Sequence, residues 1–191
     1  MSRLSSVQEL QELRDILKED ADHAKPCLVV CSGTACQAGN AGDIISVAKK
    51  HIVEKQWQDR IKLRITGCHG FCEMGPFILA EPQKAFYCRV KLEDVPRIMD
   101  AVLAGQYVEE LLYRDPVTGE KYFSRDEIPF FKHQKRVLLE KNQKIDPIRI
   151  NDYIAWDGYA ALEKVLTKKD PGWVVQEVKK AGLRGRGGAG F

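Results

Sequence analysis

The stretch Gly67-Cys68-His69-Gly70-Phe71-Cys72 places two cysteines among glycines, and Cys31-Ser32-Gly33-Thr34-Ala35-Cys36 supplies two more cysteines. Each stretch follows a run of strand-forming residues, 28–30 before the first pair and 61–65 before the second. We therefore expect loops at one edge of a sheet to present both pairs. Four sulfurs gathered at such an edge would form a binding site for a metal ion or cluster.

The spacing of the cysteines separates the possible types of metal centre. It is Cys-x4-Cys, then residues 37–67, then Cys-x3-Cys. A plant-type ferredoxin would have cysteine where this chain has Gly39, and a two-cluster bacterial ferredoxin needs Cys-x2-Cys runs, which the sequence lacks. A Rieske centre needs two Cys-His pairs, but only His69 is near these cysteines. We predict a [2Fe-2S] cluster, and its predicted ligands are Cys31, Cys36, Cys68 and Cys72.

Other interpretations of the cysteines stay open. A structural zinc site could use the same four ligands, because its cysteine pairs are also spaced by a few residues, and the chain would then be a zinc-stapled interaction module without redox activity. Buried core cysteines without metal are a further alternative. A dithiol oxidoreductase would need Cys-x2-Cys. Cys27 and Cys88 fall within strands, where we expect small apolar core residues, although Cys27 could replace a predicted ligand. We expect His69 to be a solvent-facing loop residue and Phe71 to be a lid or core contact.

The elements around the cysteines alternate in type. A helix is predicted at 6–19, where Ser6 and Glu9 have the spacing of a capping box. The further predicted elements are a strand at 27–31, a helix at 44–58, a strand at 61–65, a hairpin of strands at 77–80 and 85–90, and a helix at 93–103. This order predicts a small α/β layer structure with helices packed on a sheet.

The second half of the chain has a different character. A turn at 115–120 and a basic run are followed by predicted helices at 152–167 and 171–181, the latter ended by Gly182. The basic run contains Lys132, Lys135, Arg136, Lys141 and Lys144, and we expect a solvated surface there or a face toward acidic partner subunits. The predicted parts are an N-terminal helix at 1–24, an α/β domain at 25–106, a connector at 107–150 and the start of another domain at 151–191.

Composition narrows the functional classes. The 191 residues are 44% hydrophobic, and 30 Lys and Arg against 27 Asp and Glu give a net charge of only +3, which favours neither nucleic acid nor membrane as a partner. The start of the sequence lacks the apolar core of a signal peptide, and no apolar run approaches the roughly 20 residues of a membrane span. We expect a cytoplasmic protein without membrane insertion, in which the six cysteines serve as metal ligands or core residues rather than in disulfides.

Two segments resemble known families. Cys-x4-Cys together with residues 66–76 resembles the thioredoxin-like [2Fe-2S] ferredoxin module, over about residues 25–105. The terminal sequence 182–191, Gly-Leu-Arg-Gly-Arg-Gly-Gly-Ala-Gly-Phe, is similar to the opening of a family of flavin- and NADH-binding proteins, shared by respiratory complex I, NAD-linked and often electron-bifurcating iron hydrogenases, and NAD-linked formate dehydrogenases. Hydrogenase-type members fuse the ferredoxin module ahead of the flavin domain, which is the order here. The resemblance implies single-electron transfer through a [2Fe-2S] cluster within an NAD(H)-linked, FMN-dependent oxidoreductase, with other iron-sulfur and flavin subunits as partners.

The glycine-rich end matches G-x-G-x-x-G at residues 185–190. A Rossmann turn should follow a strand, whereas a predicted helix precedes this one, so a flexible glycine tail is the alternative. Arg184 and Arg186 beside exposed amides suit phosphate, and the resemblance implies that FMN and NADH bind at this loop. The residues that it assigns to cofactor binding are Gly185, Arg186, Gly187, Gly188 and Gly190. Family members continue for several hundred residues, so we expect a fragment that lacks a complete flavin site and does not bind flavin tightly alone.

Overall fold

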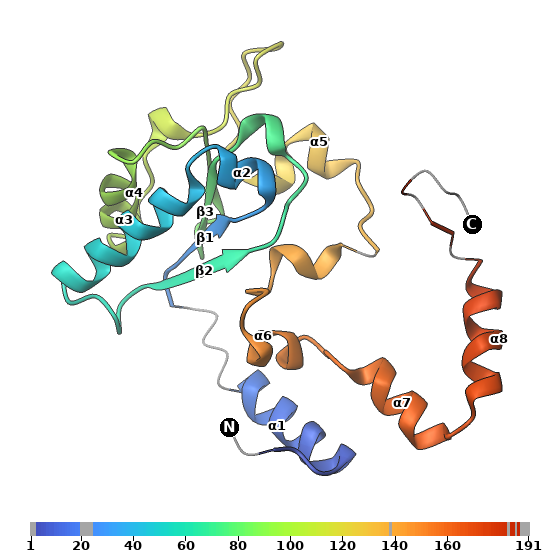
Figure 1. Ribbon diagram of the computed structural model, residues 1–191. Coiled ribbons are helices and arrows are strands. Elements are labelled where there is room, and N and C mark those ends of the chain that lie inside the picture. The colour runs from blue at the N-terminus through green and yellow to red at the C-terminus, as the bar shows by residue number, and fades with distance from the viewer. Residues whose placement is uncertain (1–2, 20–24, 138, 183, 186, 188–191) are drawn as a thin grey trace.

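A four-stranded mixed sheet organises the computed structural model, which describes residues 3–19, 25–137, 139–182, 184–185 and 187 (Figure 1). Its strands are β1 (Cys27–Cys31), β2 (Lys62–Thr66), β3 (Phe77–Glu81) and β4 (Ala85–Cys88), in the order β2-β1-β3-β4. β1 is parallel to β2 and antiparallel to β3, and β3 and β4 form an antiparallel hairpin. The predicted strands and hairpin are confirmed, with small shifts at their ends.

Side chains of β1 alternate between two cores, one on each face of the sheet. All five residues of the strand are buried. Leu28 and Val30 lie in a core with α3 (Ala41–Glu54) and α4 (Asp94–Leu103). Val29 and Cys31 lie in the other core, because successive side chains of a strand point to opposite faces. Both faces are therefore covered, which explains why the strand is apolar throughout.

The second face of the sheet is covered by residues of the segment 107–150, which the sequence predicts as a connector. Tyr113, Ile128 and Phe131 are buried there, and their core also contains Cys31. The segment also pairs with β4, because the Phe86 N–H donates to the Phe123 carbonyl at 2.9 Å. Its short helices are η2 (Glu109–Leu111), η3 (Arg125–Glu127), α5 (Pro129–Lys132) and η4 (Glu140–Gln143).

Helix α3 begins and ends earlier than the predicted 44–58. Its C-terminus is a Schellman motif, in which the Trp57 N–H donates to the Ile52 carbonyl at 2.9 Å and the Gln56 N–H to the Val53 carbonyl at 3.1 Å. Gln56 takes the left-handed conformation with φ of 56°. Because a glutamine rather than a glycine occupies this position, the sequence carries no stop signal there, and the predicted end of α3 is too late.

The helices outside the sheet are α1 (Val7–Glu19), α6 (Ile150–Ala155), α7 (Ala160–Lys168) and α8 (Pro171–Ala181). α1 packs against α6, and α7 and α8 extend away from the sheet (Figure 1). The prediction of one helix over 152–167 is wrong, because Asp157 and Tyr159 have positive φ and separate α6 from α7. A Cβ at Gly158 would lie 2.3 Å from the Tyr153 carbonyl oxygen, so this tight turn requires glycine. Within the described residues, no helix is long and apolar enough to cross a bilayer.

Candidate metal centre

The two parallel strands bring the cysteine pairs to one edge of the sheet. Cys31, the last residue of β1, is in register with Thr66, the last residue of β2. Both segments therefore leave the sheet at the same edge, and the Ser32 N–H donates to the Thr66 carbonyl at 2.9 Å just beyond it. Cys68 follows this hydrogen bond by two residues. The expected placement of the pairs at one edge is confirmed.

Cys36 and Cys72 lie in short helices rather than in the predicted loops. Cys36 belongs to α2 (Thr34–Ala38), and Cys72 begins the 3-10 helix η1 (Cys72–Met74). α2 ends after one turn, because the Gly39 N–H donates to the Ala35 and Cys36 carbonyls at 3.1 Å. Elements of this length carry no hydrophobic periodicity, so the sequence pattern does not reveal them.

The two cysteine segments are packed tightly against each other through two glycines. A Cβ at Gly33 would lie 2.8 Å from the Cβ of Cys68 and 3.4 Å from its Sγ. A Cβ at Gly75 would lie 2.8 Å from the Sγ of Cys36. Because any larger residue at either position would push the segments apart, the glycines allow each segment to approach a cysteine of the other.

The four sulfurs interact with one another. The Sγ atoms of Cys68 and Cys72 are 3.7 Å apart, and the thiols of Cys31 and Cys36 share a hydrogen bond. The pKa of Cys36 is raised by that hydrogen bond, by burial and by the charges of the other three cysteines. The pKa of Cys72 is raised mainly by its hydrogen bond with Cys68. All four side chains therefore lie within electrostatic reach of one another.

Backbone amides also point at the sulfurs. The hydrogen bond from Cys36 lowers the pKa of Cys31 to about 6 against the opposing effect of burial, and the N–H groups of Gly33 and His69 lower it further. The Gly70 N–H donates to the Sγ of Cys68 at 3.2 Å. Amides stabilise the thiolate form, which is the form that binds metals. The donor set thus fits a thiolate-bound iron-sulfur cluster.

The sulfurs of Cys68 and Cys72 are spaced like two ligands of one metal. In the described part of the chain, no three His, Cys, Asp or Glu side chains come together closely enough to hold one metal ion. Two ligands of one tetrahedral metal, with bonds of about 2.3 Å, lie about 3.8 Å apart. The Cys68 and Cys72 sulfurs, at 3.7 Å, have that separation as a pair.

Comparison with known proteins identifies the family of the segment that forms the sheet. Residues 19–103 match the thioredoxin-like [2Fe-2S] ferredoxin family. The match includes all four strands and both cysteine pairs. The chain contains a thioredoxin-like [2Fe-2S] ferredoxin domain. This match supports an electron-transfer role with a [2Fe-2S] cluster as the cofactor.

Curated relatives share shorter segments with this chain. The HndC component of the NADP-reducing hydrogenase of Solidesulfovibrio fructosivorans is 55% identical over 60 residues, which are 31% of this chain and 12% of that protein. A component of the NADH-quinone oxidoreductase of Escherichia coli is 47% identical over 45 residues, 24% of this chain and 10% of that protein. The 2Fe-2S ferredoxin of Clostridium pasteurianum is 25% identical over 77 residues, 40% of this chain and 76% of that protein. The chain therefore spans only a small part of the length of the hydrogenase and oxidoreductase components.

One solved structure aligns with about half of this chain. The thioredoxin-like [2Fe-2S] ferredoxin of Aquifex aeolicus is 25% identical, with a TM-score of 0.42. The alignment covers 48% of this chain and 98% of that one.

His69 of the ferredoxin domain does not face solvent as predicted. Its side chain is fully buried, its Nε2 lies 2.8 Å from the Thr66 Oγ1, and its ring packs edge-on against Phe77. Burial lowers the pKa of His69 to about 3, and the charges of Arg125 and Arg136 act in the same direction. The imidazole is therefore neutral at physiological pH. The backbone N–H of His69 donates to the sulfur of Cys31 and lowers the pKa of that thiol. The spacing of the sequence alone could not reveal this hydrogen bond.

Phe71 is a core contact of the ferredoxin domain. It packs against Phe131 and Tyr113 with ring centroids 5.1 and 5.4 Å away. Both partners belong to the segment after the family match, so that segment reaches the cysteine loop.

Of the remaining cysteines of the domain, Cys27 is a buried core residue and Cys88 is partly buried against the same core. Burial raises the pKa of Cys27 to about 11 and that of Cys88 to about 12, so neither forms a thiolate at neutral pH. Cys27 lies at the opposite end of β1 from Cys31.

The glycine-rich end is described only in part. Gly185 and Gly187 are exposed, and a Cβ at Gly187 would contact nothing within 4 Å. Arg186, Gly188 and Gly190 lie outside the described residues.

Proposed function

We propose that this chain carries single electrons through a [2Fe-2S] cluster held by Cys31, Cys36, Cys68 and Cys72. The observation that carries the proposal is the pairing of these cysteines at one sheet edge, with Gly33 and Gly75 at the contacts between the two segments. When bound, such a cluster supplies one-electron redox chemistry, with a potential that depends on charge, hydrogen bonds to sulfur and solvent exposure.

The residues around the four sulfurs suit that role. Cys31 and Cys36 are each 1% exposed, whereas Cys68 is half-buried and Cys72 is exposed. The first pair is therefore shielded from water. The second pair faces the surface, where a redox partner could approach. Amides of Gly33, His69 and Gly70 donate to sulfur and would favour the more negative reduced state.

The alternative function is a zinc-stapled interaction module with the same ligands. The match of residues 19–103 to the thioredoxin-like [2Fe-2S] ferredoxin family favours the iron-sulfur centre over zinc.

We further propose that this relay works within an NAD(H)-linked, FMN-dependent oxidoreductase complex that has other iron-sulfur and flavin subunits. The names of the hydrogenase and oxidoreductase relatives support this assignment. In the proposal, residues 151–191 begin a flavin and NADH domain whose glycine loop is completed by further chain. Flavin titration should therefore show no tight, stoichiometric binding to these 191 residues alone.

Metal analysis of the anaerobically purified chain tests the main proposal. We expect iron and acid-labile sulfide in equal amounts, visible absorption and an axial electron-paramagnetic signal after reduction. A colourless protein with stoichiometric zinc would instead establish the interaction module.

Serine substitutions test the choice of ligands. Cys31→Ser, Cys36→Ser, Cys68→Ser and Cys72→Ser should each lose most of the visible absorption of the reconstituted protein, because each removes a thiolate ligand. Cys27→Ser and Cys88→Ser are the controls, since both lie within strands. Cys27 is at the opposite end of β1 from Cys31, whereas Cys88 pairs with Phe77 at the same end of the sheet as the cysteine loops and is the more stringent control. Loss of absorption in a control, with retention in a predicted ligand variant, would show that a different set of four binds the cluster.

A further inference from the structure

Arg136 reaches the cysteine loop from a segment that lies beyond the family match. The match ends at residue 103, and Arg136 follows α5, whose Phe131 is packed in the core beside Phe71. The Arg136 guanidinium donates to the carbonyl of His69, the residue between the predicted ligand Cys68 and Gly70. It also donates to the Gln134 side chain at 3.1 Å and lies 5.5 Å from the Phe131 ring centroid. The guanidinium is thus fixed by several contacts.

Because Gly70 has no side chain, the guanidinium of Arg136 can lie against its backbone. A Cβ at Gly70 would lie 3.3 Å from the Arg136 Nη2, closer than most contacts of this kind. Gly70 also has φ of 83°, which side-chain-bearing residues rarely adopt. The turn of the cysteine loop and the position of the guanidinium are therefore fitted to each other.

The charge of Arg136 has no carboxylate partner within the described chain. Its hydrogen bonds go to a carbonyl and an amide oxygen, and it forms no ion pair with the aspartates and glutamates that the structure places. The neighbouring Arg125 differs, because it pairs with Asp126 at 3.1 Å. Burial lowers the pKa of Arg136 and Arg125 acts in the same direction, while the Cys68 thiolate raises it, so the guanidinium is within electrostatic reach of that sulfur. Arginine nevertheless stays charged at all physiological pH values.

We infer that Arg136 sets the reduction potential of the electron-transfer site, by placing an uncompensated positive charge beside the Cys68–Cys72 loop. The inference rests on the proposed function. Reduction brings one electron into the site from an external donor and makes the site more negative by one unit, and no bond forms or breaks. A fixed cation nearby stabilises the more negative state and therefore raises the potential.

A redox titration of the full 191-residue chain, with mediator dyes and detection by visible absorption, tests this role. Arg136→Gln should make the site harder to reduce. At a fixed applied potential we expect the ratio of reduced to oxidised protein to fall about tenfold, which is about 59 mV for a one-electron couple. Arg136→Lys keeps the charge and should change the ratio less than about threefold.

The matched control is Arg60→Gln, which removes the same charge just before β2. Cys68 follows the other end of that strand, so this control should leave the ratio unchanged. An Arg136→Gln potential equal to that of the unmodified chain would overturn the inference while leaving the proposed function intact. An Arg136→Lys shift as large as that of Arg136→Gln would also overturn it, because charge would then not be the cause.

Two further outcomes separate the inference from the proposed function. If the unmodified chain binds no iron, the proposed function fails and the inference fails with it. If Arg136→Gln alone does not fold, Arg136→Lys decides: a ratio within about threefold of the unmodified chain supports the role of charge, and a tenfold change contradicts it.

Discussion

The ferredoxin domain and the C-terminal helical arm, which we define as α6, α7 and α8, differ in what holds them in place. Every residue of β1 is buried between two cores, whereas no residue of α7 or α8 is buried. The arm exposes a set of large apolar side chains, namely Leu162, Leu166, Val175 and Val178. The domain is therefore stabilised by packing between distant segments. In the arm only α6 buries a residue, Ile154, whereas α7 and α8 depend on local interactions such as the Asp170 cap of α8.

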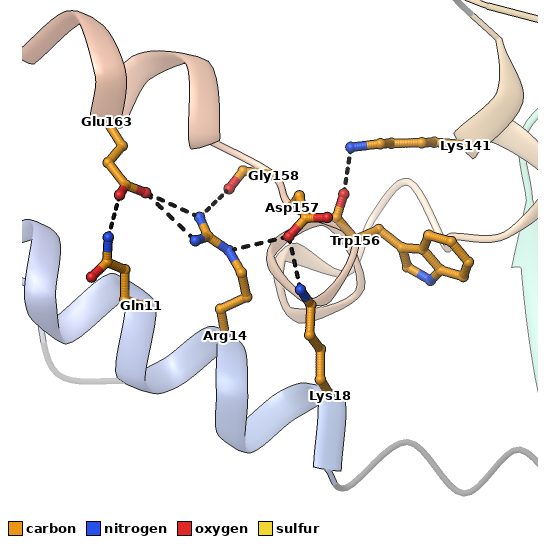
Figure 2. A network of polar contacts seen from close by, with 8 residues as sticks. All are labelled: Gln11, Arg14, Lys18, Lys141, Trp156, Asp157, Gly158 and Glu163. Atoms are coloured by element: carbon orange, nitrogen blue, oxygen red, sulfur yellow. Dashed lines mark hydrogen bonds and ion pairs between the residues drawn. The ribbon is translucent and has the colours of Figure 1, made fainter.

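Polar contacts from α1 join the arm to the N-terminus (Figure 2). Arg14 is only 9% exposed, donates to the Gly158 carbonyl at 3.2 Å and pairs with Glu163 at 3.4 Å. Lys18 pairs with Asp157 at 2.9 Å. These contacts hold the turn between α6 and α7, so the arm has one buried polar anchor where the domain has two hydrophobic cores.

The largest expected difference between the two regions is in the free energy of unfolding after the same substitution, leucine to alanine, in each. Leu28 is 1% exposed and Leu166 is 55% exposed, so truncation to alanine leaves a cavity only at Leu28. Leu28→Ala should lower the free energy of unfolding by about 2–5 kcal/mol, and Leu166→Ala should change it by less than about 0.5 kcal/mol. Urea unfolding followed by circular dichroism measures both. Equal effects would show that α7 is packed as tightly as the sheet.

A second prediction concerns the polar anchor. Arg14→Met leaves Glu163, with a side chain 18% exposed, without its cation, and should weaken the docking of α1 by roughly 1–3 kcal/mol. Hydrogen exchange should then speed up in α1 and in residues 156–163, while the strands stay protected. The control Lys18→Met removes an exposed pair and should cost about 0–1 kcal/mol. Unchanged exchange in Arg14→Met would mean that apolar contacts hold the arm.

The exposed pair of this anchor also has a pH dependence. Hydrogen bonding to Lys18 lowers the pKa of Asp157 below its ordinary 3.8. Near pH 3.8 the folded state therefore binds fewer protons than the unfolded state. The contribution of the pair to the stability of the fold is complete above pH 3.8 and is lost as the pH falls through the lowered pKa.

The same difference explains what the sequence can predict. The order of the strands, the hairpin and α8 are predictable, because short apolar or alternating runs, caps and the stop at Gly182 are local signals. The placement of both cysteine pairs at one edge follows from the strands that precede them. These features need no knowledge of the tertiary structure.

Features that depend on contacts between distant segments escape sequence patterns. The break at Gly158 lies within a pattern of helical spacing, and a helix tolerates one glycine at a cost of about 1 kcal/mol. The burial of His69 depends on Thr66 and Phe77, and the contact of Arg136 depends on how α5 packs against Phe71. The sequence does offer one sign that the basic run contacts the domain. Phe130 and Phe131 lie beside the run, and two adjacent aromatic residues indicate that the segment is packed.

The smallest expected effect on stability comes from removing a helix cap, and each region offers one cap for comparison. The Asp170 carboxylate accepts from the Trp173 N–H at 3.0 Å at the start of α8, and the Ser124 hydroxyl accepts from the Asp126 N–H at 3.3 Å at the start of η3. Each alanine substitution removes a cap worth about 1 kcal/mol. Ser124 is bridged to Ala85 of β4, so Ser124→Ala should lower the midpoint of domain unfolding. Asp170→Ala should instead reduce helicity and exchange protection in α8 alone, because α8 buries nothing against the domain. A lowered midpoint in Asp170→Ala would contradict the separation of the two regions, since loss of a local cap can reach the sheet only through packing between α8 and the domain.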